Sequence, residues 1–176
     1  MDPRYPIGPF VMGKEPLSAA ERARSIDEIA AAPEKLRAAV AGLAPAQLDT
    51  PYRPGGWTAR QVAHHIPDSH VNAYVRFKLA LTEAEPALRP YEESEWAKLP
   101  DTAATPVEVS VALLDALHLR WVALLRALGE KEFLRTARHP SWGVITVDFL
   151  LAQYAWHGRH HVAHITSLRE RMGWNP

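Results

Sequence analysis

Residues 146–173 read TVDFLLAQYAWHGRHHVAHITSLRERMG, and this stretch is the most informative about the fold. Thr146 suits the N-cap of a helix, Asp148 is favourable in its first turn, and Gly173 suits its end. Between these signals, apolar and histidine side chains recur every three or four residues, which places them on one helical face. The members of this face are Leu150, Tyr154, His157, His161, His164, Leu168 and Met172. The stretch therefore predicts one long amphipathic helix.

Capping boxes mark the starts of three earlier helices. In a capping box, a serine or threonine and an acidic or amide side chain three residues later each accept a hydrogen bond from the other's backbone amide. The chain has this pattern at residues 18–21, 58–61 and 105–108. Pro33 interrupts the first of these helices, so we expect that helix to continue to about Leu43 with a kink at the proline.

Each of these three helices also carries an apolar face of helical period. On the first, the face comprises Ile26, Ile29, Leu36, Val40 and Leu43. On the second, it comprises Val62, His65, Ile66, Ser69, Ala73, Phe77 and Leu81. On the third, it comprises Leu113, Leu117, Trp121, Leu124 and Leu128. Gly129 then suits the C-terminal end of the third helix.

Four amphipathic helices of roughly twenty residues predict an all-α fold, a four-helix bundle. The length of the chain favours a single domain over residues 1–176. The connection from Glu85 to Ala104 is long enough to be a crossover along the bundle rather than a tight hairpin. Residues 142–146 favour a short extended piece, and no other stretch has a convincing strand pattern.

The composition favours a cytoplasmic globular protein without a polyanionic partner. Twenty basic and twenty acidic residues balance, so neither nucleic acid nor an acidic membrane surface is expected as a partner. No run approaches the about eighteen apolar residues of a membrane span, and the first thirty residues lack the apolar core of a secretory signal. The chain contains no cysteine, which excludes disulfides, a thiolate nucleophile and cysteine-ligated metal sites.

Nine histidines are many for this length, and three of them are placed to meet inside the bundle. His157 and His161 lie about 40° apart on the apolar face of the last helix, one turn above the other. His65 lies on the apolar face of the second helix, whereas His64 points about 100° away. Three imidazoles with an open fourth position are typical of catalytic zinc sites. The pattern therefore predicts one divalent metal ion per chain, with zinc first and nickel as the alternative.

Other interpretations of the histidines stay open from the sequence. A single buried histidine is more often a hydrogen-bonded core residue than a metal ligand. His160 and His164 form a second pair at the same interval, although His160 lies off the apolar face. Asp68 could accept the distal N–H of a ligand, and Asp68 and His164 are the candidates for a catalytic base. The remaining histidines are expected at the surface or in supporting positions, namely His64, His70, His118 and His139.

Two sequence blocks make the chain similar to a known family. Residues 56–65, GWTARQVAHH, followed by residues 68–70 and 76–78, resemble the DinB superfamily and within it the YfiT-like metal-dependent hydrolases. The closing block, residues 156–174, resembles the same group. Shorter stretches extend the similarity to nearly the whole chain, at residues 5–8, 48–53, 89–91 and 118–121.

The resemblance implies a four-helix bundle, often a homodimer, with a metal held by one histidine of the second helix and two of the fourth. In this chain those histidines are His65, His157 and His161, the same three that face the predicted interior. Pro67 departs from the family pattern two residues after His65. Because proline has no N–H, it removes the helix hydrogen bond to the carbonyl of Ala63 and can shift His65 slightly.

Hydrolysis is the first expected function, because it is the activity that the resemblance to the YfiT-like group implies. A three-histidine zinc ion also makes bound water a nucleophile near neutral pH, with a small molecule containing an amide or ester-like bond as substrate. Relatives in the superfamily are associated with thiol S-transfer, in which the metal ionises a low-molecular-weight thiol instead of water. A non-catalytic metal-binding module is the third interpretation, and the sequence does not choose among the three.

Overall fold

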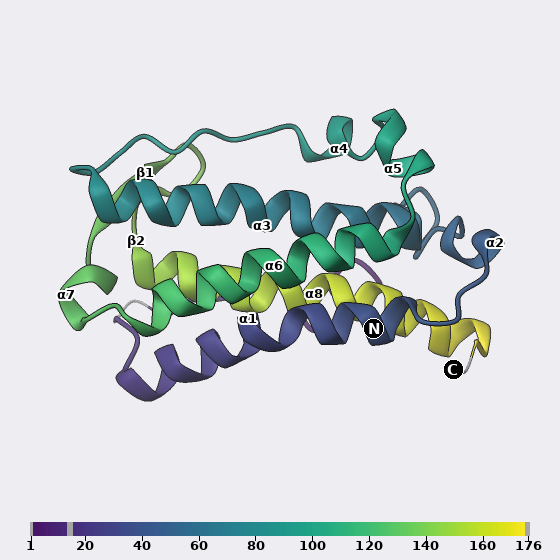
Figure 1. Ribbon diagram of the computed structural model, residues 1–176, viewed down its shortest axis with the longest axis horizontal. Coiled ribbons are helices and arrows are strands. Elements are labelled where there is room, and N and C mark those ends of the chain that lie inside the picture. The colour runs from purple at the N-terminus through teal and green to yellow at the C-terminus, as the bar shows by residue number, and fades with distance from the viewer. Residues whose placement is uncertain (1, 14–15, 175–176) are drawn as a thin grey trace.

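Four long helices form the body of the molecule, as the sequence predicts (Figure 1). The computed structural model describes residues 2–13 and 16–174. The long helices are α1 (Ala19–Val40), α3 (Ala59–Thr82), α6 (Val107–Arg126) and α8 (Val147–Met172). The short helices are α2 (Pro45–Leu48), α4 (Glu93–Trp96), α5 (Pro100–Ala104) and α7 (Glu130–Phe133). Within the described ranges, no helix combines the length and the apolar character needed to cross a membrane.

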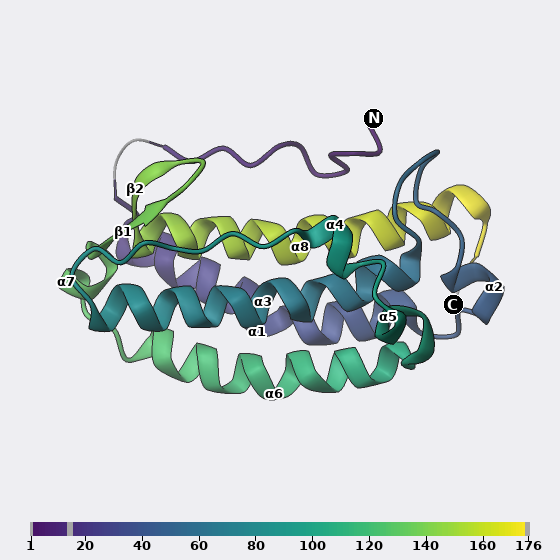
Figure 2. The same ribbon diagram turned by 90° about the horizontal axis from the view of Figure 1, so that it is seen from above.

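The long helices do not simply alternate in direction. Helices α1 and α8 run one way along the bundle, and α3 and α6 run the other way (Figure 1, Figure 2). The connection between α3 and α6 therefore travels back along the outside of α3 and carries α4 and α5, which confirms the predicted crossover. Both α1 and α3 pack against α6 and α8, so side chains of α3 and α8 can meet in the interior.

Side-chain caps explain where three of the long helices begin. Ser18 forms the expected capping box with Glu21 at the start of α1, and Thr58 forms one with Gln61 at the start of α3. The Thr146 side chain caps α8, which ends at a left-handed glycine as predicted. The hydrogen bonds of these caps join residues close together in the sequence, which is why the sequence alone locates these helix ends.

Helix α6 differs from the sequence prediction in its start and in its buried face. The capping box predicted at residues 105–108 is not formed, because Pro106 takes the N-cap position with an extended backbone and no side-chain cap. The predicted face is also rotated, since Leu113 is exposed. The helix is apolar on several sides, with Val109 and Leu119 exposed too, so periodicity left its orientation ambiguous. The face that the bundle buries includes Val111, Leu114, His118, Trp121 and Leu125.

A layer of histidines separates two apolar clusters in the core. One cluster, on the side of the β-hairpin, includes Phe77, Trp121, Ile145 and Leu150. The other includes Leu36, Ile66, Leu114 and Ile165. On α3, α6 and α8, a buried histidine lies along the chain between members of the two clusters, and these histidines are His70, His118 and His157. These three histidines therefore lie in one cross-section of the bundle, between the two apolar clusters.

A short antiparallel hairpin joins α7 to α8. Its strands are β1 (Thr136–His139) and β2 (Gly143–Thr146), and they pair in the register Thr136 with Thr146 and His139 with Gly143. The extended piece expected at residues 142–146 is thus present as β2, but the expectation of no second strand was wrong. A four-residue strand is too short for an alternating pattern to stand out in the sequence.

Candidate metal centre

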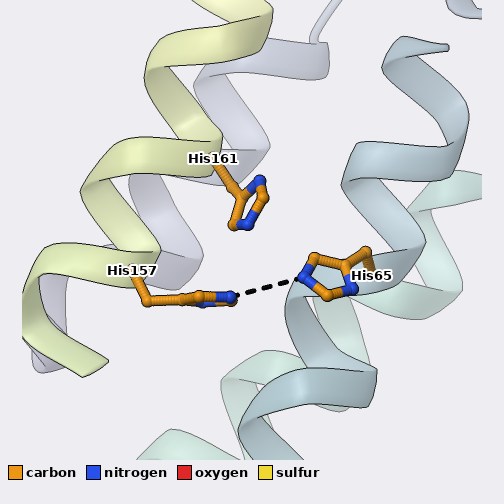
Figure 3. A group of neighbouring side chains, drawn as sticks. All are labelled: His65, His157 and His161. Carbon is orange, nitrogen blue, oxygen red and sulfur yellow. Dashed lines mark hydrogen bonds between the residues drawn. The ribbon is translucent and has the colours of Figure 1, made fainter. Parts of the chain in front are cut away.

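Three histidines from two neighbouring helices meet inside the bundle. His65 projects from α3, and His157 and His161 project toward it from successive turns of α8 (Figure 3). The Nε2 atoms of His65 and His157 lie 3.3 Å apart, and the ring centroids of His65 and His161 lie 4.7 Å apart. One ring nitrogen from each of the three residues lies within 4.8 Å of those of the other two. The structure therefore brings together the three histidines that the sequence singles out.

The separation of the His65 and His157 nitrogens suits a tetrahedral metal ion. Zinc binds imidazole nitrogens at about 2.0–2.1 Å, so two of its tetrahedral ligands lie roughly 3.3–3.4 Å apart. The Nε2 atoms of His65 and His157 are separated by this distance. Imidazole is a good ligand for zinc and nickel alike, so the three residues could hold one divalent ion of either kind.

A cavity of about 370 Å³ opens in front of the three histidines. The crossover connection supplies Tyr91 and Glu93 to its wall, and the hairpin supplies His139 and Trp142. Its remaining lining residues are Trp57, Ser69, Arg76, Pro90, Ser141, Gln153 and Tyr154. A larger cleft of about 500 Å³ lies between α1, α6 and α7, but no histidine of the described chain lines it. Volume alone therefore does not mark the candidate site.

Burial keeps the three histidines neutral. It lowers the pKa of His65 to about 4, with smaller contributions from the neighbouring His164 and His160. The pKa values of His157 and His161 lie well below the ordinary value, chiefly because the surrounding protein desolvates both rings. Metal binding requires the unprotonated imidazole, so all three rings are in the binding form at neutral pH.

A line of hydrogen-bonding groups leads from His157 across the bundle. Its Nδ1 lies 3.2 Å from His70 Nε2, and His70 Nδ1 lies 2.8 Å from His118 Nε2. His118 Nδ1 in turn donates a hydrogen bond to the carbonyl of Ile29 at 2.6 Å. We call His157, His70, His118 and the Ile29 carbonyl the inner chain.

A shorter line, the outer chain, begins at His161. Its Nδ1 lies 3.3 Å from His164 Nδ1, and His164 Nε2 donates a hydrogen bond to the carbonyl of Arg4 at 3.2 Å. Nitrogens of His160, His161 and His164 also lie close enough to form a second candidate metal group. We favour the first group, because His164 already bonds the Arg4 carbonyl and because neither His160 nor His164 lines the cavity.

The other histidines are more buried than the sequence suggested. His64 points away from the cavity, as expected, but it is buried against α6 with Nδ1 at 2.7 Å from Ser110 Oγ. His70 and His118 are buried and belong to the inner chain. Of the two positions expected for them, the supporting position is therefore correct and the surface position is wrong. His139 is partly buried in the hairpin at the wall of the cavity.

Asp68 does not make the contact expected of it. His70 and His164 lie against the far nitrogens of His157 and His161, and Asp68 forms no hydrogen bond with His65 in the described part of the structure. The Asp68 side chain is half-buried and does not line the cavity. Burial, together with Asp101 of α5, raises its pKa to about 6. It therefore belongs to the side of α3 that faces α5.

Sequence reasoning did not single out several polar groups of the cavity wall. Ser69 Oγ lies 3.3 Å from His157 Nε2, and Arg76 Nη1 donates to the hydroxyl of Tyr154 at 2.8 Å. Tyr91 reaches the cavity from the crossover connection, where burial raises its pKa to about 12. Arg76 and Tyr91 both lie in stretches that carry the family resemblance, and that was the signal that could have identified them.

Solved structures support the fold seen here. YfiT from Bacillus subtilis, described provisionally as a metal-dependent hydrolase with an unusual four-helix bundle topology, matches with a TM-score of 0.95 at 46% identity. That match covers 99% of this chain and 100% of YfiT. The four-helix bundle protein TT2238 matches with a TM-score of 0.57 at 19% identity, over 83% of this chain and 98% of its own, which supports the fold alone.

Sequence relatives point to the same group. A Bacillus cereus protein of strain B4264, provisionally named a metal-dependent hydrolase, is 51% identical over 173 residues, which are 98% of this chain and 99% of the relative. A counterpart from strain G9842 with the same provisional name is also 51% identical over that length. The family profile of the DinB superfamily matches residues 28–165. The chain therefore belongs to the DinB superfamily.

Proposed function

We propose that this protein is a metal-dependent hydrolase that holds one divalent ion, zinc before nickel, on His65, His157 and His161. The observation that carries the proposal is the convergence of three neutral imidazoles on one open cavity. Three protein ligands leave a tetrahedral ion one free position, as in catalytic rather than structural zinc sites. The provisional names of the relatives at 51% and 46% identity support the reaction class.

The cavity wall would select and hold the substrate. When bound, a divalent ion supplies Lewis acidity, which lowers the pKa of a coordinated water to about 7 and polarises a carbonyl group. Arg76 places a fixed positive charge on the wall, because its guanidinium donates to the Tyr154 hydroxyl at 2.8 Å and to the Arg89 carbonyl at 3.0 Å. A fixed guanidinium favours an oxygen-rich group, so a small molecule with a carboxylate or carbonyl near the scissile bond suits the site.

Tyr91 and Ser69 would act as hydrogen-bond donors rather than bases. The pKa of Tyr91 is raised to about 12, so its hydroxyl keeps its proton at neutral pH. Ser69 lies beside His157 on the same wall, and its hydroxyl can rotate toward a substrate oxygen. Both residues would bind and orient the substrate, whereas its activation depends on the metal.

The test is turnover of a panel of small esters and amides by the zinc-loaded protein. We expect a rate that rises with pH through about 7 and does not depend on added thiol. His157→Ala, treated with the same zinc, is the control for adventitious metal. A rate that requires a low-molecular-weight thiol would assign thiol transfer instead, since the chain has no cysteine of its own. No turnover in either arm would favour a non-catalytic metal-binding module.

A further inference from the structure

The inner chain contains one polar group from each long helix. His157 belongs to α8, His70 to α3, His118 to α6 and the Ile29 carbonyl to α1. Its three histidines are only 8%, 0% and 2% exposed in that order, so water does not compete for the nitrogens that join them to one another. Because buried polar groups need hydrogen-bond partners, each donor in the inner chain has to face an acceptor.

The carbonyl at the end of the inner chain sets the direction of every hydrogen bond in it. A carbonyl can only accept, so His118 Nδ1 carries the hydrogen and His118 Nε2 is left bare in the neutral ring. His70 therefore donates through Nδ1 to His118 Nε2, and its own Nε2 is bare. His157 then donates through Nδ1 to His70 Nε2, which leaves the lone pair on His157 Nε2.

The Ile29 carbonyl is free to accept because of Pro33. In a regular helix, this carbonyl would accept the N–H of the residue four positions later. Pro33 occupies that position inside α1 and has no N–H to donate. His118 Nδ1 takes the place of the missing donor at 2.6 Å. The proline that interrupts the helix thus creates the acceptor to which the inner chain is anchored.

We infer that His70 and His118 are positioning residues that hold His157 in the Nδ1–H tautomer, with the lone pair of Nε2 directed at the candidate metal site. The opposite tautomer would place a hydrogen where a metal ion has to bind and would set two bare nitrogens against each other at His70. The inner chain ends on the Ile29 carbonyl, which has no proton to release. The inner chain therefore orients His157 and does not conduct protons. Only its effect on metal affinity rests on the proposed function, since the tautomer exists without metal.

The tautomer can be measured directly in the metal-free protein. Nitrogen-15 NMR of labelled imidazoles distinguishes a protonated from a bare ring nitrogen. We expect Nδ1 to be protonated and Nε2 to be bare at His157, His70 and His118. A wild-type spectrum in which His157 carries its hydrogen on Nε2 would overturn the inference, whether or not zinc binds. This measurement needs no variant and so does not depend on how a variant folds.

Variants at His118 test whether the orientation is transmitted, because His118 touches none of the proposed ligands. His118→Gln keeps one acceptor for His70 and one donor for the Ile29 carbonyl, whereas His118→Leu removes both. We expect His118→Leu to give mixed tautomers at His157 and His118→Gln to keep the wild-type form. Leu114→Ala, one turn earlier on α6, is the control for a destabilised core outside the inner chain. Equal effects of His118→Leu and Leu114→Ala on the His157 tautomer would reduce His118 to a packing residue and overturn the inference.

Zinc titration supplies the second readout. Loss of the groups that orient a ligand typically lowers metal affinity by about 10–100-fold, and His118 acts one step further away, so we expect a loss of about tenfold in His118→Leu. His118→Gln should bind within about threefold of wild type. A protein with the expected tautomers that fails to bind zinc would refute the proposed function but support this inference. Unchanged zinc affinity in His118→Leu together with an unchanged tautomer would overturn it.

Discussion

Each of the two α8 histidines at the cavity has one ring nitrogen directed toward it and the other held by a further histidine. In many metal sites a carboxylate holds the far nitrogen and adds negative charge next to the ion. Here the holding groups are the neutral imidazoles of His70 and His164, whose pKa values are lowered chiefly by burial. A bound divalent ion would therefore keep its full positive charge, which favours strong polarisation of whatever occupies its open position.

Alanine substitutions along α8 should separate ligands from supporting residues. We expect wild type to carry about one zinc or nickel per chain, and we expect His157→Ala and His161→Ala to abolish tight binding. His164→Ala should weaken binding by about tenfold, because His164 contacts His161 Nδ1. His160→Ala should change affinity less, because His160 stacks on Trp156 away from the cavity. Elemental analysis and zinc titration measure both effects. Greater damage from the His160 and His164 changes would show that the second histidine group is the real site.

The three candidate ligands could be singled out from the sequence, but it did not decide whether His70 and His118 lie at the surface or support a ligand. A four-residue interval and an apolar face were enough for His157 and His161. His70 is four residues after Ile66, so it shares that buried face, yet spacing does not tell a ligand from a partner of a ligand. The sequence left His118 open between a surface and a supporting position, because the apolar surroundings of α6 hid which of its faces is buried.

Gly158 lies on the face of α8 that approaches α1 and α3 beside the site. A Cβ added there would lie 3.4 Å from Ala32 Cβ and 3.5 Å from His70 Cε1, which is ordinary contact. Glycine inside a helix costs about 0.5–1 kcal/mol relative to alanine, so Gly158→Ala should raise the free energy of unfolding by about that amount. Gly158→Leu should instead lower it by about 1–3 kcal/mol through overpacking. Urea unfolding of the metal-free protein measures both, and destabilisation by alanine would mean that His70 cannot tolerate even this contact.

Among the helices and strands, the sequence predicts those features that depend on interactions between residues close together in the chain. Ser18 and Thr58 locate two helix starts because each cap is completed within three residues. The start of α6 was misplaced because Pro106 took over the cap, and β1 was missed because its pairing depends on β2 rather than on its own four residues. The crossover could be inferred from the length of its connection, but the pairing of neighbouring helices depends on packing across the whole bundle.

The buried histidines should make the whole molecule sensitive to acid. Burial lowers the pKa of His118 from 6.5 to about 4. Between these values the unfolded chain binds more protons than the folded one, so stability falls as the pH drops from 6.5 toward 4. At pH 5, about 1.5 units below the unfolded pKa, this side chain alone lowers the free energy of unfolding by about 2 kcal/mol. Urea unfolding of the metal-free protein at pH 7.5 and pH 5 measures the loss.

His118→Gln is the matched variant for this pH dependence, because it keeps a donor and an acceptor but cannot be protonated in this range. Its loss of stability between pH 7.5 and pH 5 should be smaller than that of wild type by about 2 kcal/mol. The remaining loss would come from other buried histidines such as His160, whose pKa is also lowered to about 4. An identical loss in wild type and variant would show that His118 does not contribute.

The order of the helices along the chain has a consequence for biosynthesis. Helices α1, α3 and α6, which carry Ile29, His70 and His118, all leave the ribosome before α8 does. His157 follows His65 by 92 residues, so a nascent chain contains only one of the three candidate ligands until α8 has been made. By the time α8 is made, the two histidines of the inner chain that hold His157, His70 and His118, have already been synthesised. A metal ion would then bind tightly only to the completed bundle, and it would not hold a partly synthesised chain in an incomplete fold.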